Sequence, residues 1–191
     1  MRTAMQRAAS ALEDAGYAVE AVEPPGMARL TELWKTLIMD DVIDPLLPVV
    51  EQVGDPATRQ SMALFRAAWP RGGMERMLSA LAARDSLAHD WELFLARYPV
   101  VLLPVSAEPA LPVDLDLTPE GIQRLMAAQA PQMALSALPV PVLVVPSAVV
   151  DGLPVGPQII GPRFREDIVL TAGEVIEAAC GAVTPIDPRP A

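Results

Sequence analysis

Two short apolar runs between residues 137 and 162 constrain the fold more than any other part of the sequence. The runs Ala137–Pro146 and Asp151–Pro162 are rich in valine and isoleucine and are bounded by proline and glycine, which is typical of buried strands in an α/β protein. A polar segment over Ser147–Gly152 separates them and is expected to be a turn. Asp-Gly at its tip indicates a turn, because glycine accepts a positive φ. A helical pattern follows, so the stretch predicts strand, turn, strand, loop and helix.

The same stretch resembles a known family. Residues 152–167 read Gly-Leu-Pro-Val-Gly-x-Gln-Ile-Ile-Gly-Pro-x-Phe-x-Glu-Asp, which is similar to the carboxy-terminal signature of the amidase signature family, whose members cleave or form carboxamide bonds. Tyr98–Val105 resembles the family's strand that ends in a proline, and Pro185–Arg189 resembles the tail of such enzymes. Ser136–Val140 stands where the family has an Asn-x-x-Gly-x-Pro segment. The resemblance is specific from about residue 98 onward and diffuse before it.

The resemblance implies an α/β fold, the carboxy-terminal portion of the amidase-signature fold, in which a mixed sheet is covered by helices. Residues 1–191 are then expected to form one partial amidase domain. The first helical pattern is followed by a strand-like segment, Tyr17–Val22. An αβ unit of this kind needs an earlier strand to lie against, and none precedes it, so we expect the chain to be a truncated part of the fold.

The resemblance also implies a catalytic mechanism. Family members are understood to use a serine nucleophile, a bridging serine held by a cis peptide bond and a lysine base, with a Gly/Ser-rich loop that stabilises the oxyanion. These groups belong to the amino-terminal half of the family fold. No Gly-Gly-Ser-Ser-Gly run occurs here and no two serines are adjacent. We therefore expect no catalytic residue in this chain.

Composition and charge exclude several classes of function. The formal net charge is −10, from 14 basic and 24 acidic residues, which argues against nucleic-acid binding because such proteins carry a basic surface. The longest apolar stretch, Val140–Val150, is interrupted by prolines and is too short to span a bilayer. Met1–Ala15 lacks the apolar run of a signal peptide, and a single cysteine fits a reducing compartment. We expect a cytoplasmic protein without a membrane partner.

The spacing of apolar residues predicts the remaining elements. Gly16 is expected to end the first helix, with the strand Tyr17–Val22 after it, and Pro45 to end a helix that covers Met27–Asp44. Thr118 is expected to cap a helix that runs toward residue 126. The other expected elements are helices over Pro56–Trp69, Met74–Tyr98 and Glu166–Ala179, a strand over Val100–Leu103, an irregular segment over Ser106–Asp116, and a short helix or turn over Ala127–Leu138.

Several residues that could carry chemistry have ordinary interpretations. Lys35, the only lysine in the sequence, has no serine within a turn and is expected to be a solvated surface residue. His89, the only histidine, is expected on a helix surface or at a cap. Asp114 and Asp116 lack supporting metal ligands and predict a solvated loop. Cys180 is expected to be a small core residue, and neither a metal nor a cofactor is expected.

Two residues are candidates for the wall or support of a pocket. Ser136 stands where the family has asparagine, which weakens its claim to a role near the substrate. Gln158 matches the family motif and is expected either to support the floor of the active site or to be a hydrogen-bonded framework residue, and the framework interpretation is favoured. Pro157 stands where the family has an apolar residue. Because proline lacks an N–H, its strand is expected to be an edge strand or distorted there.

Two hypotheses about function follow, from different classes. In the first, the chain is part of an amidase that hydrolyses a carboxamide to carboxylate and ammonia, and is inactive alone because its catalytic half is absent. In the second, it is a non-catalytic partner or regulatory chain that docks on a separately encoded amino-terminal half, driven by exposed strand edges and apolar faces. The chain could also form a homo-oligomer. A third alternative is that the chain is the product of a decayed gene and aggregates.

Overall fold

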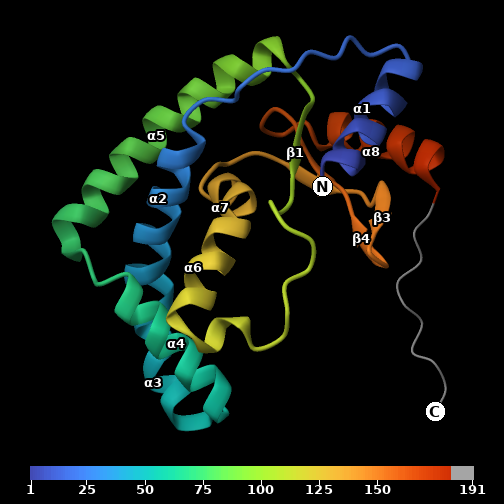
Figure 1. Ribbon diagram of the computed structural model, residues 1–191. Coiled ribbons are helices and arrows are strands. Elements are labelled where there is room, and N and C mark those ends of the chain that lie inside the picture. Colours follow the sequence, from blue (N-terminus) through green and yellow to red (C-terminus); the bar gives the residue numbers. More distant parts are fainter. Residues whose placement is uncertain (182–191) are drawn as a thin grey trace. The chain divides into compact units, whose positions relative to one another are not determined.

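The computed structural model describes residues 1–181, apart from the side chains of residues 39 and 40. The resemblance at Pro185–Arg189 therefore lies outside the described residues. The chain divides into two compact units (Figure 1). Unit 1 comprises Met1–Glu23, Leu95–Val105 and the described part of Val140–Ala191, and unit 2 comprises Pro24–Phe94 and Ser106–Pro139. No helix among the described residues is both long enough and apolar enough to cross a membrane.

Unit 1 is built on a three-stranded sheet in the order β1-β5-β2 and a separate β3–β4 hairpin. Its elements are α1 (Arg2–Asp14), β1 (Val101–Pro104), β2 (Val142–Val144), β3 (Ala148–Val150), β4 (Leu153–Val155), β5 (Pro157–Ile160) and α8 (Glu166–Cys180). The register places Leu102 and Leu143 on either side of Ile159. The α/β class is confirmed, and the pairings between the described strands are antiparallel, whereas a mixed sheet was expected.

The core of unit 1 lies between this sheet and the helices α1 and α8. Ile159 is fully buried and packs with partly buried Leu102 and Leu143, which share its face of the sheet because side chains alternate along strands. Gly173 of α8 allows the helix to approach the sheet, since a Cβ there would lie 2.3 Å from Cδ2 of Leu143. The buried cluster consists of Ala8, Ala11, Leu12, Val145, Ile159, Val169, Ala172 and Ile176.

The end of α1 has the predicted chemistry, but the strand expected after it does not form. Gly16 has φ +94°, and its N–H donates to the carbonyl of Glu13 while the N–H of Tyr17 donates to that of Leu12. These two bonds are a Schellman motif. The strand expected over Tyr17–Val22 is wrong: the segment pairs with no strand among the described residues. A strand needs a partner for its backbone groups, which local sequence does not supply.

The turn between the two apolar runs is narrower than expected. Asp151 and Gly152 have φ values of +52° and +80°, so they form a two-residue hairpin turn with positive φ at both positions. The expected polar turn over Ser147–Gly152 contains strand β3, and the second apolar run divides into β4 and β5. Asp-Gly therefore marks the turn correctly, while the strand count in this region is higher than predicted.

Of the two alternatives expected at Pro157, an edge strand is wrong, and the strand is instead interrupted just before it, since β4 ends at Val155 and β5 begins at Pro157. Its strand, β5, is the central strand of the sheet. Pro157 is the first residue of β5 and faces Pro104 across the β1–β5 ladder, while its carbonyl accepts a hydrogen bond from the N–H of Val145 (3.3 Å). A proline is tolerated at the first residue of a strand because the ladder loses no interior donor there.

Unit 2 is helical. It contains α2 (Met27–Ile38), a π-helical turn (Met39–Ile43), α3 (Asp44–Val53), α4 (Pro56–Ala68), most of α5 (Gly73–Arg97), a 3₁₀ turn (Leu115–Leu117), α6 (Pro119–Ala128) and α7 (Ala130–Ser136). Thr118 caps α6 as predicted, because its hydroxyl accepts the N–H of Gly121 (3.0 Å). Ile122, Met126 and Met133 are buried and pack against aromatic residues of α2 and α4.

Pro45 does not end a helix in unit 2. The chain leaves α2 through the π-helical turn and continues into α3, where Pro45 lies in the first turn. The missing N–H of Pro45 is tolerated because the π-helical turn directly before α3 interrupts the regular α-helical hydrogen bonding there. The helix expected over Met27–Asp44 is therefore shorter, and α3 was not predicted. The helices expected over Pro56–Trp69 and Met74–Tyr98 are confirmed as α4 and α5.

Candidate functional site

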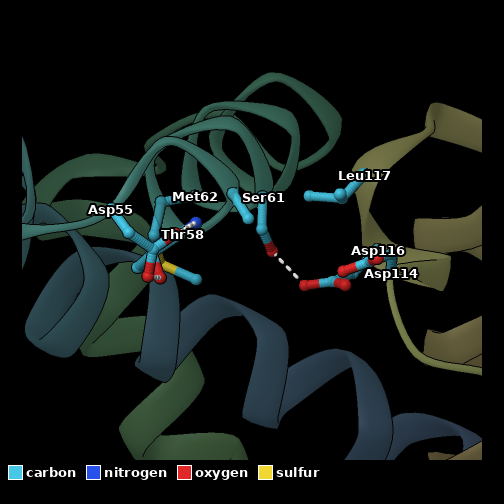
Figure 2. A pocket seen from close by; sticks show the side chains of 8 residues that line it. Asp55, Thr58, Ser61, Met62, Asp114, Asp116 and Leu117 are labelled. Carbon is cyan, nitrogen blue, oxygen red and sulfur yellow. Dashed lines mark hydrogen bonds between the residues drawn. The ribbon is translucent and has the colours of Figure 1, made fainter.

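A pocket of about 230 Å³ lies in unit 2, between the first half of α4 and the segment 114–117. Figure 2 shows the two groups of side chains facing each other across it. The pocket is lined by Asp55, Ala57, Thr58, Ser61, Met62, Asp114, Asp116 and Leu117. Both walls are built from local turn and cap chemistry that fixes the directions of the polar groups.

Asp55 fixes the α4 wall by capping the helix. Its Oδ1 accepts the backbone N–H of Thr58 (3.0 Å) and its Oδ2 accepts the Thr58 hydroxyl (2.9 Å). Pro56 follows at the first helical position, so the sequence Asp-Pro begins the helix as expected. The two hydrogen bonds from Thr58 hold the pKa of the Asp55 carboxyl below its ordinary value, because both favour the ionised form. The bond from the backbone N–H has the larger effect and the bond from the hydroxyl the smaller one.

The opposite wall is held by bonds from α4. Asp114 adopts a left-handed conformation with φ +62°, which aspartate tolerates better than most residues. Asp116 accepts a hydrogen bond from the hydroxyl of Ser61, a side chain that is 4% exposed. Gln60 Nε2 donates to the carbonyl of Leu117 (2.7 Å). Two neighbouring residues of α4 therefore fix the 3₁₀ turn that carries Asp116.

The chemistry of this pocket favours a cationic or hydrogen-bond-donating group over hydrolysis. Three of the residues that line it are aspartates and none is basic. Ser61 already donates to a carboxylate, and an aspartate is too weak a base to ionise a serine hydroxyl. Among the described residues, no group of three or more His, Cys, Asp or Glu side chains is arranged to hold a metal ion.

The solvated loop expected at Asp114 and Asp116 is half correct. Asp114 is exposed, but Asp116 is partly buried and bonded to Ser61. Sequence reasoning missed Ser61, because 55 positions separate it from Asp116 and no local pattern joins them. The one signal available was that Ser61 is a polar residue at an inward-facing position of its helix, which indicates a buried hydrogen bond.

Gln158 is a buried residue of the central strand in unit 1. Its side chain is 3% exposed, and Nε2 donates to the backbone carbonyl of Pro104 on the neighbouring strand (3.0 Å). This is the contact that a framework residue would make, since it satisfies a buried amide. Whether Gln158 also supports a substrate pocket stays a prediction.

Ser136 lies in unit 2, at the last position of α7. It is exposed, and its hydroxyl donates to the carbonyl of Gln132 one turn earlier (3.0 Å). Arg84 of α5, which the sequence did not single out, donates from Nε to the carbonyl of Ala137, the next residue (2.7 Å). The backbone after α7 is thereby fixed. Ser136 and Gln158 belong to different units.

Lys35 is less exposed than expected. Its side chain is 16% exposed, with Nζ 2.6 Å from Oε1 of Glu32 and 5.5 Å from the ring centroid of Trp69. The expectation of a solvated lysine is wrong because most of its side chain is covered and its amine is paired with Glu32. The amine contacts a carboxylate and an aromatic ring, so Lys35 is engaged in structural contacts.

His89 and Cys180 have the expected ordinary roles. His89 lies on α5 with 66% of its side chain exposed, and Nδ1 is 4.0 Å from Oε2 of Glu92. Cys180 ends α8 as a free thiol, partly buried against the core of unit 1. Both expectations are confirmed by these positions.

Comparisons with known proteins agree on one family. The family model described as Amidase matches residues 1–170. The indoleacetamide hydrolase of Bradyrhizobium japonicum is 30% identical over 194 aligned residues, which cover 96% of this chain and 40% of that enzyme. The indoleacetamide hydrolase of Bradyrhizobium diazoefficiens is 30% identical over 182 residues, which cover 94% of this chain and 35% of that enzyme.

Solved structures show the same fold. The crystal structure of an amidase superposes with a TM-score of 0.72 at 24% identity, covering 94% of this chain and 42% of that one. A 6-aminohexanoate cyclic dimer hydrolase in complex with its substrate superposes with a TM-score of 0.74 at 18% identity. The superposition covers 93% of this chain and 41% of that hydrolase. The chain thus spans about 40% of the length of the Bradyrhizobium japonicum hydrolase and of these two structures.

Proposed function

The chain belongs to the amidase signature family, and from this premise we propose that it forms the non-catalytic, carboxy-terminal part of a hydrolase that cleaves the C–N bond of a carboxamide. The observation that carries the proposal is the similarity to indoleacetamide hydrolase along almost the whole of this chain. Because the chain spans only part of that enzyme, the activity belongs to the complete fold.

We propose that the nucleophile and its base come from the part of the fold that this chain does not match. Amide hydrolysis by a serine needs a hydroxyl within reach of a base that can take its proton. The one lysine, Lys35, is engaged with Glu32 and Trp69, and the buried hydroxyl of Ser61 donates to Asp116. These contacts support a structural use of both residues.

The two pocket candidates then have supporting roles. Gln158 holds the carbonyl of Pro104 in place, so it fixes the spacing of β1 and β5 at one end of the sheet. We assign it to the support of the substrate-pocket floor. Ser136 is assigned to the pocket wall because it is exposed at the end of α7, next to the backbone that Arg84 holds.

The proposed substrate class is a small carboxamide, with indoleacetamide as the first compound to test, since the relatives are named for its hydrolysis. A chimera tests the proposal: residues 1–191 replace the matched region of the Bradyrhizobium japonicum enzyme. We expect ammonia release from indoleacetamide by the chimera and none by the 191-residue chain alone. Hydrolysis by the isolated chain that persists through repeated purification would refute the proposal, and so would a folded chimera without activity.

A second role, in assembly, is favoured by exposed apolar side chains on an edge strand of unit 1, at Val142 and Val144. Such a surface favours a chain that docks on a separately supplied catalytic half. Co-purification of the native chain with a polypeptide that carries paired serines and a lysine, followed by recovery of amidase activity, distinguishes this role from a single continuous enzyme.

A further inference from the structure

The turn between β3 and β4 carries the one Asp-Gly pair of the sequence, which contains no asparagine. When glycine follows an aspartate, its backbone nitrogen can approach the aspartate side chain closely, because glycine has no Cβ in the way. Asp151 and Gly152 are both exposed, with φ values of +52° and +80°. This turn therefore combines a chemically reactive pair with access to water.

The two reacting groups are not held by other parts of the protein. In the part of the chain that the structure describes, no hydrogen bond or ion pair engages the Asp151 carboxylate or the Gly152 N–H. Apart from its chain neighbours, a Cβ built on Gly152 would meet no atom within 4 Å. The ladder pairs Val150 with Leu153, which leaves the turn residues outside it. The turn can thus fluctuate toward a reactive geometry without unfolding the unit.

Other aspartates of the chain lack these features. Asp85 precedes Ser86, a small residue, and both are exposed. They lie inside α5, however, where an interior N–H donates to the carbonyl four residues earlier and is held in place. Asp44 and Asp55 precede prolines, which have no N–H to react. Asp85 is therefore a suitable internal comparison for Asp151.

The β3–β4 hairpin contacts the start of α1, so a change in its turn has a structural consequence. The hydroxyl of Ser147 donates to the carbonyl of Ala4 (2.9 Å), and Ala4 packs with Ala148 and Val155. The N–H of Ser147 donates to the carbonyl of Val155 (3.0 Å). Because the turn sets the register of a hairpin, an additional backbone atom at Asp151 would disturb these contacts.

We propose that Asp151 is a site of spontaneous isoaspartate formation, and that the altered turn loosens the β3–β4 hairpin from α1. The Gly152 nitrogen attacks Cγ of Asp151 and forms a C–N bond. The carboxyl group loses a hydroxyl, which leaves with the amide proton as water, and a succinimide ring results. This inference does not rest on the proposed function.

The succinimide is then opened by water. Water adds to one of the two ring carbonyl carbons, and the bond from that carbon to the nitrogen breaks. Opening at the side-chain carbonyl restores aspartate, whereas opening at the backbone carbonyl leaves the chain linked through the side chain of Asp151. The second product is isoaspartate, which adds one atom to the backbone and has the same mass as aspartate. Water is the only co-reactant.

The test incubates the 191-residue chain at neutral pH for several weeks and then measures isoaspartate. The folded fraction, recovered by gel filtration, is used throughout. A methyltransferase specific for L-isoaspartate, supplied with a labelled methyl donor, counts the altered residues, and peptide mapping by mass spectrometry locates them. The succinimide is identified by the loss of the mass of one water. We expect isoaspartate at Asp151 to exceed that at Asp85 by about tenfold or more.

Two variants preserve the turn and change its chemistry. Asp151→Asn keeps a favoured pair for this type of turn and releases ammonia, a more readily displaced group than the hydroxyl of a carboxylate, so isoaspartate should form faster. Asp151→Gly also suits a turn with positive φ and removes the carboxyl group, so methyl transfer should fall close to the level of the unincubated chain. Asp85→Ala is the matched control and should leave methyl transfer unchanged.

Hydrogen exchange measures the structural consequence. In molecules that carry isoaspartate, the Ser147 amide should exchange about tenfold or more faster than in the unincubated chain, because the hairpin opens more often. The Ile122 amide, which donates to the carbonyl of Thr118 in unit 2, is the control and should not change. The proposal is overturned if Asp151 gains no more isoaspartate than Asp85, or if Asp151→Gly accepts as much methyl label as the native chain. Unchanged exchange at Ser147 in isomerised molecules would also overturn it.

Discussion

The side-chain amide of Gln158 donates a hydrogen bond to the backbone carbonyl of Pro104, 3.0 Å away on the neighbouring strand. The bond joins positions 54 residues apart and lies at the end of the ladder where Pro104 faces Pro157. Neither proline can donate a backbone hydrogen bond there. Pro157 directs its own carbonyl toward β2, where it accepts from Val145, so it is the Gln158 side chain of β5 that bonds the Pro104 carbonyl.

Replacing Gln158 with leucine is expected to destabilise unit 1. The Pro104 carbonyl would lose its donor in a partly buried position, which costs about 1–3 kcal/mol in the free energy of unfolding. Urea denaturation followed by circular dichroism measures this change. Gln6→Leu, at an exposed position of α1, is the control and should shift stability by less than about 0.5 kcal/mol. Equal effects of the two variants would contradict the framework role.

The bond between Ser61 and Asp116 is expected to hold the wall of the pocket in unit 2. Ser61→Ala leaves the carboxylate without this donor, at an expected cost of about 1–2 kcal/mol. Hydrogen exchange at the Leu117 amide, which donates to the carbonyl of Asp114, should become faster as the 3₁₀ turn loosens. Ser79→Ala, at an exposed position of α5, is the control. Unchanged exchange at Leu117 in Ser61→Ala would argue against this role.

The Asp55 cap is expected to make the stability of α4 depend on pH. Its pKa is lowered by the bonds from the Thr58 N–H and hydroxyl, so the folded state favours the ionised form. This contribution is present above the ordinary pKa of 3.8 and is lost as the pH falls through the lower pKa of the folded state. Asp55→Ala should therefore lower the melting temperature at neutral pH, and the difference from the native chain should shrink under strongly acidic conditions.

The control for that comparison is Asp85→Ala, which removes an exposed aspartate from the α5 helix. A difference between native chain and Asp55→Ala that stays constant from neutral to strongly acidic pH would show that the cap does not act through the ionised carboxylate.

Lys35 is expected to be dispensable for hydrolysis. Lys35→Met removes the amine but keeps an unbranched apolar stem over Trp69, so stability should change by less than about 1 kcal/mol. In the chimera, kcat/KM for indoleacetamide should stay within about twofold, because a residue held in structural contacts adds no stabilisation to the transition state. A loss of about a hundredfold or more would identify this lysine as the base and overturn our assignment of the base to the unmatched part of the fold.

The parts of the fold that were predicted correctly depend on short-range chemistry. Gly16 ends α1, Thr118 caps α6, and Asp151 and Gly152 form a hairpin turn. Each of these features is decided by bonds within a few residues, so the residue types at fixed spacing are sufficient. The family motif over residues 152–167 is equally local, and the family it indicated is the one that the comparisons show.

The features that were predicted wrongly depend on partners distant in sequence. Tyr17–Val22 has the composition of a strand but pairs with none in the described chain, and Pro157 begins a central strand whose neighbours lie on both sides. Lys35 has the polarity of a surface residue, yet the approach of Trp69 next to α4 covers it. Composition does not reveal which groups meet across such separations.

The sequence by itself determined the helix ends, the hairpin turn, the family and the expectation that the chemistry lies elsewhere, because these follow from local bonding and from residues that are present or absent. Only the tertiary structure decided that Ser61 meets Asp116, that Gln158 meets Pro104, and that β5 is the central strand between β1 and β2. Contacts of this kind form when distant segments pack together, and their energies depend on burial and geometry that no single segment contains.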